Sequence, residues 1–425
     1  MPPPEKRGDS HGGSVDVDRS NHYDIIIVGG GAVGLAAAYH ACKDNVRILL
    51  LEQYDFRNQL SSSGGATRQF RLQYAEDYMA RLVQQSIPFW DELQSHTRET
   101  LRTQVGSVWF GDPHVASSEG QIKGAMEVMK RMKIPYEELT AKQIDERFHF
   151  RNLPEDYIGF FQKDGGTLNV PGTLETMLEQ LRASGRATLL SRQKVTGVKS
   201  KPGEVSVSTE SGTFHARKLV LTAGPFTNQV LAHLGFELDL VTWQMVSCYF
   251  KKTRSDVDFP SWFVFENEAE HYDPGLYYGF EEVHWSNSGY IRVAPAFALH
   301  TFRDPAERTE RPDPMDIWLT SKWVRQHMPG LDPEPRFTSW CMAALPADGD
   351  KKMFLDFAPE SVPNHEDIVI FAGGWSFKFV PLLGRICADL ALRGRTELDI
   401  SHFEIPGPRK EPVASTAHLR RLFAF

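Results

Sequence analysis

The sequence is poor in cysteine and has no long hydrophobic run. Only four of its 425 residues are cysteines, at positions 42, 248, 341 and 387, and they form neither a C-x-x-C motif nor a disulfide framework. The most apolar stretch, residues 25–39, is shorter than the roughly 20 residues of a membrane helix and contains three consecutive glycines. We therefore expect no membrane span and no metal site, and we expect a protein of a reducing compartment, by default the cytoplasm.

Excess positive charge is also lacking. The formal net charge is −8, with 47 lysines and arginines against 55 aspartates and glutamates. Because nucleic-acid-binding proteins normally carry a basic patch or stripe, this balance argues against a nucleic-acid partner. Internal repeats and coiled-coil heptads are absent from the sequence. Residues 1–22 are rich in proline, glycine and charge, and we expect a disordered extension there rather than a signal peptide.

The chain does contain a βαβ unit with a dinucleotide fingerprint. Residues 23–28 form an Ile- and Val-rich strand, residues 35–43 a helical stretch and residues 46–51 a second strand. A G-x-G-x-x-G pattern separates the first strand from the helix and consists of Gly29, Gly30, Gly31, Ala32, Val33 and Gly34. Such glycines let the backbone approach a pyrophosphate, and the helix N-terminus attracts its negative charge. The unit therefore predicts a bound dinucleotide.

The residue after the second strand and the ends of two later strands indicate which dinucleotide the chain binds. Glu52, beside Gln53, follows the fingerprint at about the 20-residue separation at which an acid binds the adenosine ribose. The fingerprint alone does not separate NAD from FAD. Two later strands, residues 218–222 and 367–371, also run into glycines, and three such junctions in one sheet favour FAD.

This strand pattern predicts an α/β fold of two interleaved domains. The strand–glycine junctions indicate a Rossmann-like parallel sheet assembled from distant segments. Residues 240–250, 262–266 and 290–296 are rich in aromatic and β-branched residues and are typical of antiparallel strands. The expected limits are 23–110, 160–238 and 336–405 for the FAD-binding domain, 111–159 and 239–335 for an antiparallel-sheet substrate domain, and 406–425 for a C-terminal tail.

Three further segments resemble the monomeric sarcosine oxidase family of FAD-dependent amine oxidases. They are Gly65-Ala66-Thr67-Arg68-Gln69-Phe70-Arg71, Trp340-Cys341-Met342 and Gly374-Trp375-Ser376-Phe377-Lys378-Phe379. The similarity extends in order over residues 23–403. Further matches, such as Asp164-Gly165-Gly166-Thr167, resemble the branch of the family that oxidises a cyclic imine in secondary metabolism. The resemblance implies a fold of the glutathione reductase/D-amino acid oxidase type.

The resemblance also implies that FAD is held covalently, as an 8α-S-cysteinyl adduct of Cys341. Such attachment needs a cation or a helix N-terminus near the pyrimidine end of the flavin. A helix that starts near Pro381 and ends before Gly394 offers such a terminus. The cofactor-binding residues expected from the fingerprint and the resemblance are Gly29, Gly31, Ala32, Val33, Gly34, Glu52, Gln53, Thr67, Arg68, Val195, Ala223, Gly224, Cys341, Gly374, Phe377 and Lys378.

The catalytic residues implied by the resemblance are Arg71, Lys378, Glu119, Tyr278, Trp375 and Arg292. In this scheme the guanidinium of Arg71 and the ammonium of Lys378 hold the substrate carboxylate. Glu119 orients or deprotonates the substrate nitrogen. Tyr278 matches an active-site tyrosine of the family, and Trp375 lies over or beside the flavin. Arg292 stands where sarcosine oxidases place a lysine that activates oxygen.

The implied activity is the oxidation of a small cyclic imino acid or secondary amino acid, similar to piperideine-2-carboxylate or pipecolate. Hydride passes from the carbon beside nitrogen to flavin N5, and O2 reoxidises the flavin to give H2O2 in an enzyme expected to be a monomer. Three alternatives stay open: an N-methyl amino acid oxidase that releases formaldehyde, a dehydrogenase with another electron acceptor, and a non-enzymatic flavin-binding scaffold. Ala296 replaces an aspartate of the cyclic-imine branch, which predicts a wider specificity.

Overall fold

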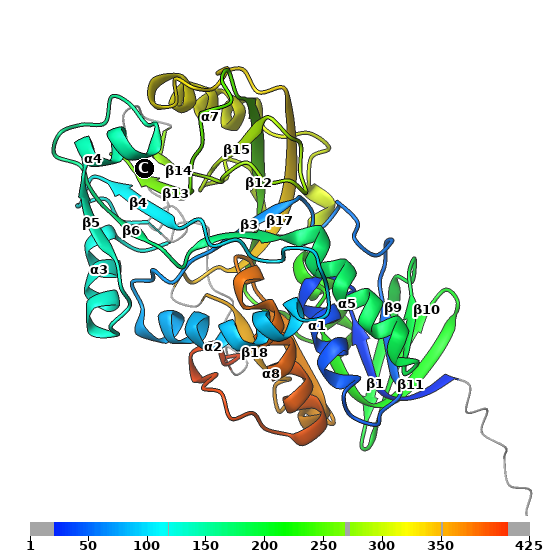
Figure 1. The fold of residues 1–425 in the computed structure, drawn as a ribbon. Coiled ribbons are helices and arrows are strands. Elements are labelled where there is room, and N and C mark those ends of the chain that lie inside the picture. The colour runs from blue at the N-terminus through cyan, green and yellow to red at the C-terminus, as the bar shows by residue number, and fades with distance from the viewer. Residues whose placement is uncertain (1–20, 118, 268–272, 350–351, 407–425) are drawn as a thin grey trace, which may run out of the picture.

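The computed structural model describes residues 21–117, 119–267, 273–349 and 352–406. The disordered extension expected at 1–22 and the tail expected at 406–425 therefore lie almost wholly outside the described residues. Within these residues the strands form two large sheets and one two-stranded sheet. Figure 1 shows the two large sheets in different halves of the molecule, with α1, α5 and α8 beside β1.

The sheet that carries the fingerprint is mostly parallel. Its strands are β1 (His22–Val28), β2 (Ile48–Leu51), β8 (Ala187–Leu190), β9 (Val195–Lys201), β10 (Glu204–Thr209), β11 (Gly212–Leu221), β18 (Phe354–Phe357) and β19 (Ile368–Ala372). The parallel strands follow the order β19-β11-β1-β2-β8, and β18 pairs antiparallel with β19. β1, β11 and β19 are adjacent, so the three predicted strand–glycine junctions do share one sheet.

The second large sheet is antiparallel apart from one pair of strands. In the described residues it contains β4 (Ser107–Gly111), β5 (Glu137–Thr140), β6 (Ile158–Gln162), β12 (Leu240–Lys251), β13 (Ser261–Phe265), β14 (Leu276–Gly279), β15 (Tyr290–Pro295), β16 (Thr301–Phe302) and β17 (Phe337–Pro346). β4 and β13 are the parallel pair. The small sheet pairs β3 (Thr67–Phe70) with β7 (Gly166–Asn169). The chain passes between the large sheets more than once, which confirms the interleaved α/β fold.

Strand pairing differs from the predicted domain limits at three places. β4, the end of β6 and β17 were expected inside the FAD-binding domain, but all three strands belong to the antiparallel sheet. The physical reason for β17 is its long pairing with β12, which runs from Leu240 opposite Pro346 to Tyr249 opposite Phe337. A strand that ends near the cofactor region can therefore still belong to the substrate side of the molecule. The domain limits as a whole stay a prediction.

Helices pack against both large sheets. They are α1 (Ala32–Ala41), α2 (Asp77–Gln94), α3 (Ile122–Arg131), α4 (Ala141–Phe148), α5 (Val170–Ser184), α6 (Thr227–Leu231), α7 (Pro314–His327) and α8 (Val380–Arg393). α1 packs against α5 and α8, and α7 packs against β12 and β15. A Cβ at Gly384 of α8 would lie 2.4 Å from Ala36 of α1, so a glycine is needed where these helices touch.

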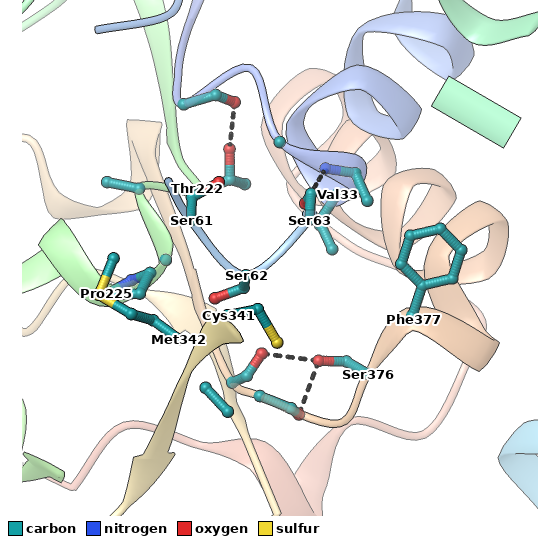
Figure 2. Close-up of a pocket in the computed structure, with 18 of the residues that line it drawn as sticks. Val33, Ser61, Ser62, Ser63, Thr222, Pro225, Cys341, Met342, Ser376 and Phe377 are labelled. Carbon is teal, nitrogen blue, oxygen red and sulfur yellow. Dashed lines mark hydrogen bonds between the residues drawn. The ribbon is translucent and has the colours of Figure 1, made fainter. Parts of the chain in front are cut away.

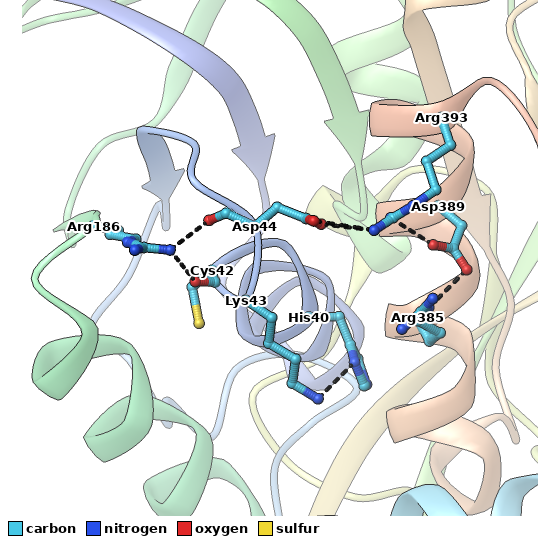
Figure 3. Close-up of polar contacts among 8 residues, drawn as sticks. All are labelled: His40, Cys42, Lys43, Asp44, Arg186, Arg385, Asp389 and Arg393. Carbon is cyan, nitrogen blue, oxygen red and sulfur yellow. Dashed lines mark hydrogen bonds and ion pairs between the residues drawn. The ribbon is translucent and has the colours of Figure 1, made fainter.

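Cations hold the C-terminal end of α1 (Figure 3). The Arg186 guanidinium donates to the carbonyl oxygens of Cys42, at 3.3 Å, and Asp44, at 2.8 Å. Arg393 of α8 pairs with the Asp44 carboxylate at 3.1 Å and with Asp389 at 2.7 Å. Positive charge at a helix C-terminus is favourable because the carbonyls there have no intrahelical partner. These contacts fix α1, and with it the fingerprint loop at the other end of the helix.

Candidate active site

A cavity of about 630 Å³ lies at the carboxyl ends of β1, β11 and β19. It extends from the fingerprint loop to the antiparallel sheet, where β13, β14, β15 and β17 contribute side chains. This is the edge at which open α/β sheets bind their ligands. Figure 2 shows Val33, Ser63, Cys341 and Ser376 around the cavity, although they come from segments far apart in the sequence.

The structure brings nearly all predicted site residues to this cavity. Those that line it are Gly29, Gly31, Ala32, Val33, Glu52, Gln53, Arg68, Arg71, Glu119, Val195, Ala223, Gly224, Tyr278, Arg292, Cys341, Gly374, Trp375, Phe377 and Lys378. Gly34 and Thr67 do not line it. A Cβ at Gly34 would lie 1.9 Å from the Gly29 carbonyl oxygen, so this glycine serves close packing. Thr67 instead accepts hydrogen bonds from Arg292.

The fingerprint end of the cavity is built from backbone and one buried carboxylate. Gly29 has a φ of +104°, a backbone conformation that residues other than glycine rarely adopt. The Glu52 carboxylate accepts from the backbone N–H groups of Gly30 and Tyr54, both at 2.8 Å. Burial raises the pKa of Glu52, and these two hydrogen bonds oppose the rise. Both contacts hold the carboxylate at the end of β2, on the cavity wall.

A serine loop that the sequence interpretation missed borders the same end. Ser61, Ser62 and Ser63 all line the cavity, and the Ser63 hydroxyl accepts from the Ala32 N–H at the start of α1, at 3.0 Å. Arg68 holds this loop, because its Nη2 donates to the carbonyls of Ser62 and Gly64 at 2.8 and 2.7 Å. The run of three serines before two glycines was the available sequence signal.

Cys341 lies on β17, where the two sheets approach each other. Its Sγ is 3.7 Å from Nη2 of Arg68, so a guanidinium stands beside the thiol. The turn after β19 lies on the other side of the cavity region that contains Cys341. There the Ser376 hydroxyl donates to the carbonyls of Gly373 and Gly374, at 2.7 and 2.9 Å. This turn leads into α8, as the helix prediction required.

The turn before α8 is tight and strained. A Cβ at Gly374 would lie 2.8 Å from Leu345 and 3.1 Å from Ala343, so β17 leaves no room for a side chain. Trp375 has a φ of +50°, in the left-handed region that costs a residue other than glycine roughly 1–2 kcal/mol. Its indole packs edge-on against Trp243, with ring centroids 5.5 Å apart. Such strain is typical of functional sites.

Arg71, Glu119 and Lys378 lie close together on the cavity wall. Arg71 forms an ion pair with Glu119, and its Nη1 donates to the Gln73 carbonyl at 2.5 Å. The guanidinium also stacks on Tyr74 and Trp109, at 4.2 and 4.8 Å from the ring centroids. Arg71 is 3% exposed. The cation is therefore fixed on several sides.

Electrostatics couple these three groups. Burial favours a raised pKa for Glu119, but the charges of Arg71 and Lys378 outweigh it and hold the pKa below its ordinary value. Burial, followed by the Arg71 charge, lowers the pKa of the Lys378 ammonium to about 7. The cluster carries one firmly charged guanidinium, one ionised carboxylate and one amine that titrates near neutral pH. An added anion would stabilise the charged form of that amine.

A second buried cation faces the cavity from β15. The Arg292 Nη1 donates to the backbone oxygen and the hydroxyl of Thr67, at 2.6 and 2.8 Å, and its Nε donates to Ser247 at 3.0 Å. Tyr278 lies beside it, with its hydroxyl 3.5 Å from Nη2. Among the described residues no ion pair includes Arg292. Its positive charge is thus available to the cavity.

The match to known proteins agrees with this architecture. The chain belongs to the FAD dependent oxidoreductase family, whose model matches residues 24–390. It is 30% identical over 408 residues to the peroxisomal sarcosine oxidase of Homo sapiens, across 93% of this chain and 98% of that protein. The protein is therefore an FAD-dependent amine or amino acid oxidase, as the sequence predicted.

Two further proteins are similar to this chain over most of its length. A Dictyostelium discoideum protein named as a bifunctional amine oxidase is 35% identical over 404 residues, which cover 90% of this chain but only 37% of that longer protein. The open form of NikD, an unusual amino acid oxidase essential for nikkomycin biosynthesis, is 39% identical with a TM-score of 0.86, across 91% of this chain and 98% of that one. These similarities confirm the predicted family and fold class.

Throughout the described residues, each helix is too short or too polar to cross a bilayer.

Proposed function

We propose that this oxidase acts on a small cyclic imino acid or a secondary amino acid, similar to piperideine-2-carboxylate or pipecolate. The observation that carries the proposal is the Arg71–Glu119–Lys378 cluster on the cavity wall, in which both cations are buried. Two cations suit a carboxylate, since a guanidinium can donate two parallel hydrogen bonds and an ammonium adds a point charge. The 39% identity to NikD supports an amino acid substrate.

The cavity fits FAD in its chemistry. Gly29 and Gly31 expose backbone at the start of α1, where the helix N-terminus favours a diphosphate, and Glu52 offers a fixed carboxylate to a ribose. Arg68, Cys341 and the turn at Gly374 would border the isoalloxazine ring. Bound FAD supplies the acceptor for the two electrons and two hydrogens that leave the carbon–nitrogen bond, and O2 takes them to form H2O2.

The protein's own residues would bind and orient the substrate. Arg71 and Lys378 hold its carboxylate, and a bound anion keeps the Lys378 amine protonated. Glu119 neutralises Arg71 when no substrate is bound, so the site has no unpaired guanidinium at any stage. Arg292 would stabilise negative charge that develops on oxygen during reoxidation, in place of the lysine of sarcosine oxidases.

We also propose that Cys341 would hold FAD covalently. The support is the Arg68 guanidinium 3.7 Å from its sulfur, because nucleophilic cysteines act as thiolates and lie beside cations. The predicted monomeric state and cytoplasmic location are likewise proposals.

A second candidate is an N-methyl amino acid oxidase that releases formaldehyde. It is favoured by the sarcosine oxidase relatives of Homo sapiens and Bacillus, which are 30% and 29% identical over nearly the whole chain. A carboxylate-binding site serves both classes, so geometry near the nitrogen decides between them.

The test is H2O2 release from purified enzyme with piperideine-2-carboxylate, pipecolate, proline and sarcosine. We expect the highest kcat/KM with a cyclic substrate. Formaldehyde together with the highest kcat/KM on sarcosine would establish the second candidate instead. Substrate-dependent reduction of an artificial acceptor without H2O2 in air would identify a dehydrogenase, and no turnover of any substrate would favour a flavin-binding scaffold.

A further inference from the structure

Gln69 is a polar residue of the cavity wall that none of the expected roles uses. It lies on β3 between Arg68 and Arg71, is half-buried, and lines the cavity together with Phe263 and Tyr278. Its Nε2 donates to the carbonyl of Trp262 at 2.8 Å and to the carbonyl of Gly279 at 3.4 Å. The side chain therefore bridges β3 to the paired strands β13 and β14.

These two partners fix which way the carboxamide points. Backbone carbonyl oxygens only accept hydrogen bonds, so the NH2 group of Gln69 must face both of them. The NH2 group has two N–H bonds, and the two carbonyls use both. The amide oxygen, on the other branch of the same carbon, points away from these carbonyls. No donor in the described residues bonds to it, so the wall presents a fixed acceptor to the cavity.

The substrate end of the cavity is otherwise dominated by donors. Arg68, Arg71, Arg292 and Lys378 only donate. The one carboxylate there, Glu119, accepts from Arg71 through Oε2 and so lies against a cation. A substrate with both a carboxylate and an N–H group finds several partners for its anion, whereas its nitrogen has two acceptors to choose between, Glu119 and Gln69, and Gln69 is the one that is not held against a cation.

We propose that the Gln69 Oε1 accepts a hydrogen bond from the substrate N–H and so positions the nitrogen. This inference rests on the proposed function and deepens it, because it assigns recognition of the nitrogen to Gln69 rather than to Glu119. A buried N–H without an acceptor is costly, so a site built to accept it discriminates against analogues that lack it. Gln69 is thus a substrate-positioning residue for compounds in which N–H lies next to the carbon that carries the carboxylate.

A matched pair of planar carboxylates tests the assignment without turnover. Pyrrole-2-carboxylate has an N–H next to its carboxylate-bearing carbon, and furan-2-carboxylate has an oxygen in the same position. Each is titrated into the FAD holoenzyme, and the change in flavin absorbance gives Kd. We expect wild type to bind the pyrrole roughly tenfold more tightly. In Gln69→Met and Gln69→Leu the preference should fall below about twofold, with furan affinity nearly unchanged.

Gln94→Met is the control, because Gln94 also donates to two backbone carbonyls, those of Glu99 and Thr97, but lies outside the cavity. It should keep the wild-type preference, as should Glu119→Met, which removes the acceptor of Glu119. A preference that survives in either Gln69 variant, or its absence from wild type, overturns the assignment while the carboxylate site stands. If neither compound perturbs the flavin, the carboxylate site itself is wrong and the assignment falls with it. Should both Gln69 variants fail to fold, loss of the preference in Glu119→Met, which lacks an acceptor, overturns the assignment, and its retention supports it.

Discussion

Removing the Arg71 guanidinium is the sharpest perturbation of the proposed site. In Arg71→Ala the cavity loses its firmly charged cation, and Glu119 loses its ion-pair partner. The neighbouring Lys378 does not replace the guanidinium, because an ammonium adds a point charge and cannot donate two parallel hydrogen bonds to a carboxylate. The stacking of the guanidinium on Tyr74 and Trp109 is lost as well.

The magnitude follows from the burial of these groups. Truncating one partner of a buried, hydrogen-bonded charge pair costs about 2–5 kcal/mol. At about 1.36 kcal/mol per tenfold change, this corresponds to a loss of roughly 30- to 5,000-fold in kcat/KM, so we expect about 100-fold or more. The loss should nearly disappear for an amine that lacks a carboxylate, because such a compound does not use the removed cation.

Steady-state kinetics on the best substrate of the panel measure the effect. Arg102→Ala is the matched control, since Arg102 also stacks on a neighbouring ring, that of Phe70, and does not line the cavity. Arg71→Ala/Glu119→Gln separates the lost cation from the carboxylate left without a partner. Unchanged kinetics in Arg71→Ala, with a normal flavin spectrum, would show that the substrate carboxylate binds elsewhere.

Three further predictions concern the tether, the pH dependence and the specificity. Cys341→Ser should bind FAD that acid precipitation releases, whereas wild type should stay yellow and carry the mass of FAD; free flavin from wild type would refute the tether. The charged ammonium of Lys378 binds anions, so the Kd of furan-2-carboxylate should rise as pH increases through about 7, where Lys378 loses its proton. Lys378→Met should flatten this pH profile. An unaltered slope in that variant would exclude Lys378 from the carboxylate site. Ala296 lines the cavity, and Ala296→Asp should narrow the substrate range towards cyclic imines; equal selectivity would show that this position does not set it.

The parallel half of the molecule was predictable because local signals and tertiary structure agree there. β1 is Ile- and Val-rich because it is buried on both faces: Ile25 and Ile27 cluster with residues of α1 and α8, and Ile26 and Val28 cluster with residues of β9 and β10. The junctions after β11 and β19 have the same pattern, so their place in one sheet with β1 followed. The helix from Val380 to Arg393 was recognisable from its early proline and from Gly394, which adopts a φ of +69° at the C-cap.

Features that depend on pairing between distant segments were beyond the sequence. The strand that carries Cys341 pairs with β12, about a hundred residues earlier, and no local pattern distinguishes that partner from the parallel sheet. The ion pair between Arg71 and Glu119 joins two loops in the same way. Gln69 stands inside a recognised motif, but its orientation is set by carbonyls on β13 and β14, which only the assembled fold supplies.

The cavity has the opposite charge to the molecule around it, and this contrast explains how one site serves two ligands. The chain carries a formal net charge of −8, yet Arg68, Arg71, Arg292 and Lys378 all line the cavity. The diphosphate of a dinucleotide and the carboxylate of an amino acid are both anions, so a positive cavity attracts both. Charge alone would not keep them in separate places. The glycine backbone at α1 accepts only a group that can approach closely, and Arg71, held by Glu119 and two aromatic rings, lies at the other end. The shape of the cavity would therefore keep the two ligands apart, and its positive charge would attract both of them.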